Sequence, residues 1–222
     1  MKKTMFALAG LTATALLAGS ALADSASGPG GPVPDGNGSG VWQTALPNNP
    51  LVSTVVLNQV ASIQSIVIPV TVTHTWMGDL QAILFDPSGT GYNIFVRPGF
   101  TGTGFGNSGD LLAGTYTYVD PTSGNPTLPS AGNSVPGSTY SQNYGGSGTG
   151  IWTNGNLNVF DTGMNSISGA AGVWTLKVYD WAGGDTGSIG SWTINYTSVP
   201  APGALALLGL AGLVGGGRRR RS

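Results

Sequence analysis

The sequence predicts an all-β protein whose folded part is a β-sandwich or a jelly roll. Apolar residues in the middle of the chain recur with a period of two, as in strands with one buried face. Between the two ends of the chain, no segment shows an apolar stripe with helical spacing. The 38 glycines and the many β-branched residues suit short strands joined by tight turns.

The expected strands follow one another along the middle and the end of the chain. Alternation from Ile66 to Trp76 predicts a half-buried strand, in which Pro69 indicates an edge position or a bulge. Leu80–Phe85 is apolar on both faces and predicts an interior strand. The turn residues of Asp86–Thr90 predict an antiparallel return along Tyr92–Val96. Three later strands are expected, at Gly114–Val119, Val173–Tyr179 and Ser191–Thr197.

Two segments rich in glycine, serine and proline interrupt this pattern. Residues 24–40 predict a flexible leader, and Asp120–Gly150 predicts a long surface excursion. Residues 41–198 then form one domain, which is long enough to bury a core without disulfides. Trp76, Trp174 and Trp192 lie in strand motifs and are expected in that core.

The first 23 residues have the features of a secretory signal peptide. Lys2 and Lys3 precede an apolar run from Met5 to Ala18, and a small-x-small site ends at Ala23. Signal peptidase is therefore expected to cut between Ala23 and Asp24. The chain is predicted to be exported.

Residues 199–222 combine a proline-containing motif, a short apolar run and four arginines. The run Ala204–Val214 predicts a helix shorter than the roughly 20 residues that span a bilayer comfortably. Arg218–Arg221 would keep the end of the chain in the cytoplasm. The tail resembles the PEP-CTERM sorting signal of Gram-negative bacteria, which implies processing by an exosortase after transient anchoring in the inner membrane. The motif residues are Val199, Pro200, Ala201 and Pro202, with Ala201 where the family usually has Glu; the alternative is a plain C-terminal anchor.

Between the two ends, the chain is strongly acidic. Residues 24–200 contain two basic residues, Arg97 and Lys177, and nine aspartates, a net charge of −7. This balance disfavours nucleic acid as a partner. Cysteine is absent, which excludes disulfides, thiolate metal sites and cysteine catalysis. Three aspartates are candidate calcium ligands, Asp79, Asp180 and Asp185, and the alternative is that they cap turns.

Two blocks of sequence are specific enough to indicate a known family. His74 to Thr90 reads HTWMGDLQAILFDPSGT, and Gly172 to Ile194 contains GVWTLKVYD, GDTG and SWTI in that order. Together they resemble the P domain of kexin-like and furin-like proprotein convertases, over about Leu51 to Thr197. The resemblance implies an eight-stranded jelly-roll sandwich. In convertases this domain follows a subtilisin-like protease and stabilises it.

The sequence predicts no catalytic residues. A serine triad needs a base beside its nucleophile, and the single histidine, His74, shares the apolar phase of a strand without a serine nucleophile motif. His74 is therefore expected to be a hydrogen-bonded structural residue. Two neighbouring aspartates are the residue types that a glycosidase uses for catalysis. The aspartate pairs of this chain, however, belong to the motif blocks, where a role in folding is expected.

The predicted function is that of a non-enzymatic, exported module with a structural or interaction role in the cell envelope or extracellular matrix. One alternative is an exopolysaccharide-binding module, with Tyr140, Tyr144 and Trp152 as a platform for stacking on sugars. Another is an accessory domain that stabilises a separately encoded secreted serine protease. The sequence does not identify the binding partner.

Overall fold

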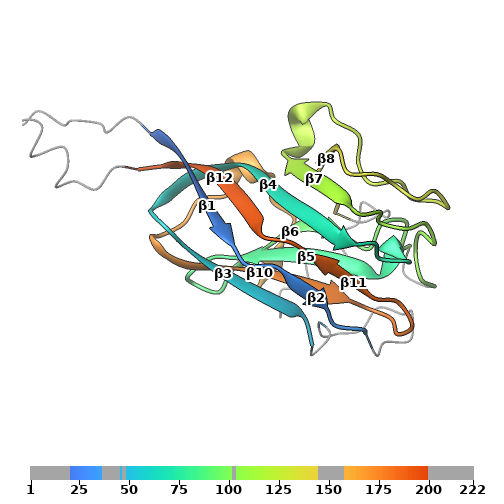
Figure 1. The fold of residues 1–222 in the computed structure, drawn as a ribbon. Helices are drawn as coiled ribbons and strands as arrows, with labels where there is room; N and C mark the ends of the chain where they lie inside the picture. Colours follow the sequence, from blue (N-terminus) through green and yellow to red (C-terminus); the bar gives the residue numbers. More distant parts are fainter. Residues whose placement is uncertain (1–20, 37–45, 47–48, 102–103, 145–157, 200–222) are drawn as a thin grey trace, which may run out of the picture. The chain divides into compact units, whose positions relative to one another are not determined.

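A computed structural model of the chain describes residues 21–36, 46, 49–101, 104–144 and 158–199. Ala21–Val199 is one compact unit, in which two β-sheets face each other (Figure 1). The described residues contain strands and three short 3-10 turns but no α-helix, in agreement with the predicted all-β class. Within that part of the chain, no helix has the length and hydropathy to span a bilayer.

The larger sheet has seven strands and the smaller has five. In the larger sheet the order is β1-β12-β4-β11-β2, with β7 paired to β4 and β8 paired to β7; in the smaller it is β3-β10-β5-β6-β9. The strands are β1 (Leu22–Gly28), β2 (Gly31–Val33), β3 (Leu51–Leu57), β4 (Val60–Val72), β5 (Leu80–Phe85), β6 (Gly91–Val96), β7 (Gly114–Val119), β8 (Thr139–Ser141), β9 (Val159–Phe160), β10 (Gly172–Asp180), β11 (Gly187–Ile189) and β12 (Trp192–Ser198). The 3-10 turns are η1 (Met77–Asp79), η2 (Pro121–Ser123) and η3 (Met164–Ser166).

The predicted central strands and their connecting turn are confirmed. β5 lies between β10 and β6 in antiparallel pairing, and its first five residues are buried, as expected for an interior strand. The turn before β6 is held by Asp86, whose Oδ1 accepts hydrogen bonds from the backbone N–H groups of Ser88 and Thr90 at 2.8 and 2.9 Å. Gly89 has a φ of +85°, which a glycine adopts without strain.

Pro69 does not lie at an edge, because β4 pairs with β7 on one side and with β11 and β12 on the other. The register with β11 shifts between Ser188 and Ile189, and the Gly190 N–H donates to the Pro69 carbonyl at 2.7 Å. Proline is thus accommodated beside an irregularity in the ladder, which is the bulge alternative.

The expected flexible leader is wrong for the part of residues 24–40 that the structure describes. β1 pairs with the last strand, β12, over its whole length, and β2 pairs with β11. Both strands lie at the edge of the larger sheet and carry no alternating apolar pattern; β1 is mostly exposed, and Val33 is the one buried residue of β2. Backbone hydrogen bonds, with little buried side-chain surface, hold them there.

The expected surface excursion at Asp120–Gly150 is also wrong where the structure describes it. Leu128, Val135 and Tyr140 are 2%, 7% and 7% exposed, so the segment contributes side chains to the core. Its strand β8 pairs in parallel with β7. The few apolar residues are widely spaced among glycine, serine and proline, which hides them from a composition-based prediction.

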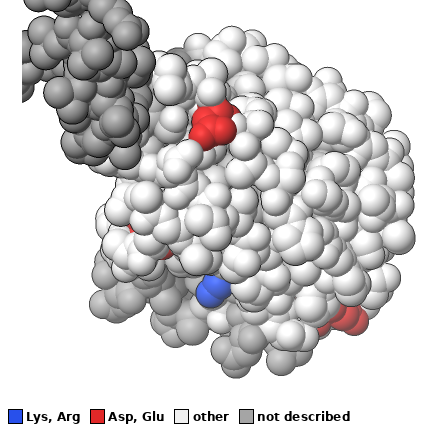
Figure 2. Space-filling model, turned by 60° about the vertical axis from the view of Figure 1, so that its left-hand side comes forward, with Lys and Arg blue, Asp and Glu red and all other residues white. Residues whose placement is uncertain are grey.

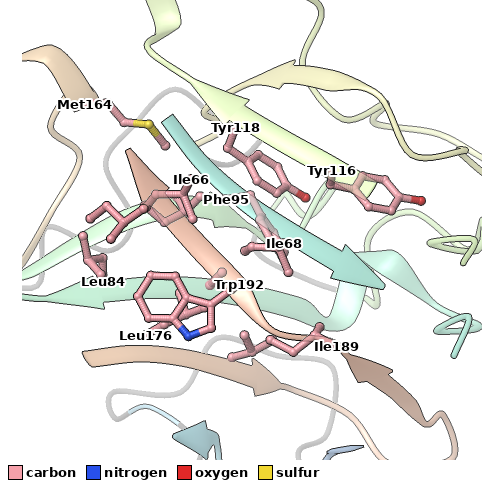
Figure 3. Packing of buried hydrophobic residues seen from close by; sticks show 14 of the residues in the cluster. Ile66, Ile68, Leu84, Phe95, Tyr116, Tyr118, Met164, Leu176, Ile189 and Trp192 are labelled. Atoms are coloured by element: carbon pink, nitrogen blue, oxygen red, sulfur yellow. The ribbon is translucent and has the colours of Figure 1, made fainter. Parts of the chain in front are cut away.

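The main core fills the space between the two sheets (Figure 3). Trp174 and Trp192 are completely buried, as predicted, and the Trp192 indole N–H donates to the Ser53 hydroxyl at 2.7 Å. Trp76 is only half-buried, contrary to the prediction, because it follows the end of β4 in a loop. A smaller buried cluster of Ile83, Val96, Val159, Tyr179 and Trp181 lies apart from the main core.

Candidate functional site

The two motif blocks meet around His74, just beyond the end of β4. The His74 Nε2 atom lies 3.2 Å from Asp180 Oδ2, and His74 is 2% exposed. Its backbone N–H and carbonyl both bond to Leu111. The other Asp180 oxygen, Oδ1, accepts from the Ala182 N–H at 3.1 Å. These contacts confirm a hydrogen-bonded structural histidine that ties β10 to the loop after β4.

A second buried pair, Arg97 and Asp79, lies next to the first. Arg97 Nη2 donates to Asp79 Oδ1 at 3.1 Å, and Arg97 Nε donates to the Gly78 carbonyl at 3.0 Å. The guanidinium also lies 3.8 Å from the centre of the Phe100 ring. Arg97 has a φ of +30°, in a region that a side chain makes unfavourable, so these contacts hold it against backbone strain.

Burial shifts the protonation equilibria of this pair. Desolvation raises the pKa of Asp79 from 3.8 to about 7, although Arg97 opposes the shift and Asp180 and Asp185 add to it. Desolvation likewise lowers the pKa of Arg97 to about 10, against the effect of Asp79. Asp180 and Asp185 thus lie near Asp79, whose carboxylate contacts the Arg97 guanidinium directly.

The three predicted calcium ligands do come close together, but their arrangement does not fit a calcium site. Asp79 is engaged by Arg97, Asp180 by His74 and the Ala182 N–H, and Asp185 by the Thr75 hydroxyl. No group of three His, Cys, Asp or Glu side chains in the described ranges is arranged to hold a metal ion. The guanidinium supplies the positive charge that a cation would bring. Asp180 acts as the turn-capping alternative predicts.

Beside the buried pairs, an open hollow is lined by Trp76, Asp79, Phe105, Ala182, Gly183 and Asp185. The Trp76 indole N–H donates to the Phe105 carbonyl at 2.8 Å, and the two rings meet edge to face with centres 6.2 Å apart. Phe105 is 46% exposed. The hollow therefore combines two partly exposed aromatic rings with two carboxylates.

A chain of buried polar side chains crosses the smaller sheet. The Trp181 indole N–H donates to Gln81 Oε1 at 2.9 Å, and Gln81 Nε2 donates to Asn93 Oδ1 at 2.9 Å. Asn93 Nδ2 in turn donates to Asp161 Oδ1 at 2.8 Å. Burial raises the pKa of Asp161. Every member has a partner, so the chain fixes the positions of β10, β5 and β6 relative to one another.

Tyr140 cannot belong to the predicted sugar-stacking platform. Tyr140 lies in the core, where its ring stacks on Tyr116 at 5.9 Å and its hydroxyl donates to the Pro136 carbonyl at 3.0 Å. Tyr144 is half-buried, with its hydroxyl oxygen inside the protein. Trp152 lies outside the described residues. A buried Tyr140 removes one of the three rings on which the prediction depended.

The processing sites fall near or beyond the limits of the described residues. Ala23 and Asp24 lie in β1, opposite Thr197 and Tyr196, so cleavage between them would remove only the first two residues of that strand. Asp24 Oδ2 accepts from the Tyr196 hydroxyl at 2.9 Å, which anchors the expected new N-terminus. Of the sorting motif, Val199 is described and residues 200–202 lie outside the described ranges.

Charged side chains are sparse on the surface of the folded part. Figure 2 shows a face on which uncharged residues dominate and charged residues stand apart. Lys177 lies 4.8 Å from the centre of the Phe85 ring. The ion pairs found among the described residues are the two buried ones, His74–Asp180 and Arg97–Asp79.

No protein-family model and no curated protein matches the chain. Among solved structures, it is similar to a serine protease of Aeromonas sobria in complex with a chaperone, with 14% identity and a TM-score of 0.32. That match covers 81% of this chain and 28% of the protease chain. The same protease alone gives 14% identity, 80% and 27% coverage and a TM-score of 0.31. A likeness at this level assigns neither a family nor a function.

Sequence reasoning missed Arg97, Trp76 as a hollow-lining residue, and Phe105. Arg97 stands outside the motif blocks, but it is one of two basic residues between the terminal segments, which is a signal for a special role. Phe105 lies among glycines in a segment without strand periodicity. Nothing in the linear order indicates that it would meet Trp76.

Proposed function

We propose that the chain is a non-enzymatic, exported P-domain-like module that acts by binding in the envelope or extracellular matrix of a Gram-negative bacterium. The observation that supports this proposal is that the buried ionisable side chains bond to one another. His74, Asp180, Asp79 and Arg97 are each at most 2% exposed and are bonded to one another in pairs. They join loops and strands, and each is engaged by a partner within the chain, whereas a general acid or base must be free to exchange a proton with a substrate.

The proposed location depends on the two ends of the chain, with their signal-peptide and PEP-CTERM-like features. Processing would leave a mature protein that starts at Asp24. The described fold is compatible with this start, because the remainder of β1 stays paired with β12. A sandwich with a net charge of −7 and no cysteine would then depend on its core for stability.

The test is fractionation of a Gram-negative host that produces the full chain, with and without an exosortase, followed by intact-mass measurement. We expect an exported protein that has lost residues 1–23 in both hosts and the C-terminal tail only in the host with the enzyme. A cytoplasmic protein of full mass would refute export. An equal mass in both hosts would refute exosortase processing and favour the plain anchor.

A further inference from the structure

The hollow beside the buried pairs is formed by three loops. Trp76 and Asp79 come from the segment between β4 and β5, Phe105 from the segment after β6, and Asp185 from the turn after β10. The Trp76–Phe105 hydrogen bond and the Thr75–Asp185 hydrogen bond link these segments to one another. Hydrogen bonds therefore hold the three loops in place around the hollow.

The charge around the hollow is negative. Asp79 and Asp185 line the hollow, Asp180 and Asp185 both raise the pKa of Asp79, and the cation bonded to Asp79 is the guanidinium of Arg97. Asp35, an exposed residue, approaches the same turn and accepts from the Gly184 N–H at 2.9 Å. Carboxylates therefore outnumber cations here, which favours a positively charged occupant.

The rings of Trp76 and Phe105 indicate which kind of positively charged group fits the hollow. Aromatic faces attract cations, and their apolar surface also packs against an aliphatic stem. A nearly buried carboxylate, that of Asp79, lines the hollow, so a cation must reach past the rings to approach it. A lysine or arginine side chain carries its charge at the end of a flexible stem and fits this requirement. An amino sugar carries its ammonium directly on a bulky ring and does not.

We propose that this hollow binds a lysine or arginine side chain of a partner protein, with the stem against Trp76 and Phe105 and the charge toward Asp185 and Asp79. The inference rests on the proposed role as a binding module and names the chemistry of the partner. It is tested on purified protein, so its failure would leave the export experiment unaffected.

The experiment is an NMR titration of the full-length chain in mild detergent with an acetylated Gly-Lys-Gly amide. The reporters are the Trp76 indole N–H and the backbone N–H groups of Gly183 and Gly184. We expect saturable shifts at these groups with the lysine peptide and with its arginine analogue. The norleucine analogue, which keeps the stem but lacks the charge, is expected to give none.

Two variants separate the contributions of charge and ring. Asp185→Asn retains an acceptor for Thr75, and Phe105→Ser removes a side chain that is 46% exposed, so neither should disturb the fold. Each should weaken peptide binding about two- to fivefold, the range for one exposed ion pair or cation–π contact. The matched control is Asp24→Asn, which removes one charge near the paired Tyr196, away from the hollow.

Four outcomes would overturn the proposal. One is the absence of saturable shifts with either cationic peptide. Another is equal binding of the norleucine peptide, which would indicate a merely apolar site. The third is a glucosamine oligomer that binds more tightly than the lysine peptide at the same reporters, which would assign the hollow to an amino sugar. Equal weakening by Asp24→Asn would reduce the effect to net charge and likewise contradict it.

Discussion

Replacing Asp79 by Asn should make the protein more stable at pH 8 and leave its stability nearly unchanged at pH 4. The carboxyl of Asp79 is 1% exposed, and desolvation raises its pKa from 3.8 to about 7. Between these two values the folded state keeps the proton and the unfolded state releases it. The free energy of unfolding of the wild type therefore falls as the pH rises through this range, and it levels off above about pH 7.

The size of the effect follows from the shift. At 1.36 kcal/mol for each pKa unit, a rise from 3.8 to about 7 corresponds to roughly 4 kcal/mol, an upper value because the protein relaxes around a buried charge. Asn resembles the protonated carboxyl and still offers an oxygen to Arg97 Nη2. Its own contribution does not change with pH.

The assay is urea unfolding followed by tryptophan fluorescence at pH 4, 6 and 8. The stability difference between Asp79→Asn and the wild type should grow from near zero to between about 1 and 4 kcal/mol. Asp110→Asn, at a partly exposed position, is the control for a general loss of negative charge. Parallel pH profiles for wild type and variant, or a variant that is less stable at pH 8, would refute this account of the buried pair.

Three further predictions concern charge, metal and packing. Arg97→Met should destabilise the protein by roughly 1 kcal/mol more at pH 8 than at pH 5, because it removes the cation that favours the ionised form of Asp79; urea unfolding at both pH values measures this. The midpoint of thermal unfolding should be the same in calcium and in chelator. A higher midpoint in calcium would contradict the conclusion that the three aspartates already have hydrogen-bond partners within the protein. Trp192→Ala should cost about 3–5 kcal/mol, because it opens a cavity and removes the hydrogen bond that the indole donates to Ser53, whereas Trp76→Ala should cost much less in the same assay.

The central part of the fold could be predicted because its strands either alternate between buried and solvated side chains or are apolar on both faces. β5 was recognisable from apolar residues on both faces, and β10 and β12 from tryptophan and aliphatic residues on one face. The turn at Asp86 was recognisable from local chemistry alone, since Asp, Pro and Gly each favour one position of it. These features depend on residues that are close in sequence.

The edge strands could not be predicted in this way. β1 and β2 pair with β12 and β11, which lie more than 150 residues away, and edge strands need no continuous apolar face. Small residues are tolerated in them because the backbone supplies the contacts. A segment rich in glycine and serine therefore resembles a linker until its pairing partner is known.

The candidate site was predictable in its residue types but not in its pairing. The motif blocks supplied Asp79, Asp180 and Asp185, and the structure brings them together as expected. Arg97 makes calcium binding by these three aspartates unnecessary. Its guanidinium lies 3.1 Å from Asp79 and provides the positive charge that was expected from calcium. That contact joins the residue before β5 to the residue after β6, and no spacing rule specifies it.

The buried pair and the hollow share Asp79, so binding should depend on pH in a predictable direction. Protonation of Asp79 below about pH 7 removes one negative charge from the lining of the hollow and should weaken binding of the lysine peptide. The peptide titration repeated at pH 8 and pH 6 measures this, with tighter binding expected at pH 8. Asp79→Asn should bind more weakly at pH 8 and show no comparable change between the two values. If that variant keeps the full pH dependence of the wild type, a different group controls the charge of the hollow, and Asp79 does not contribute to the recognition of the cation.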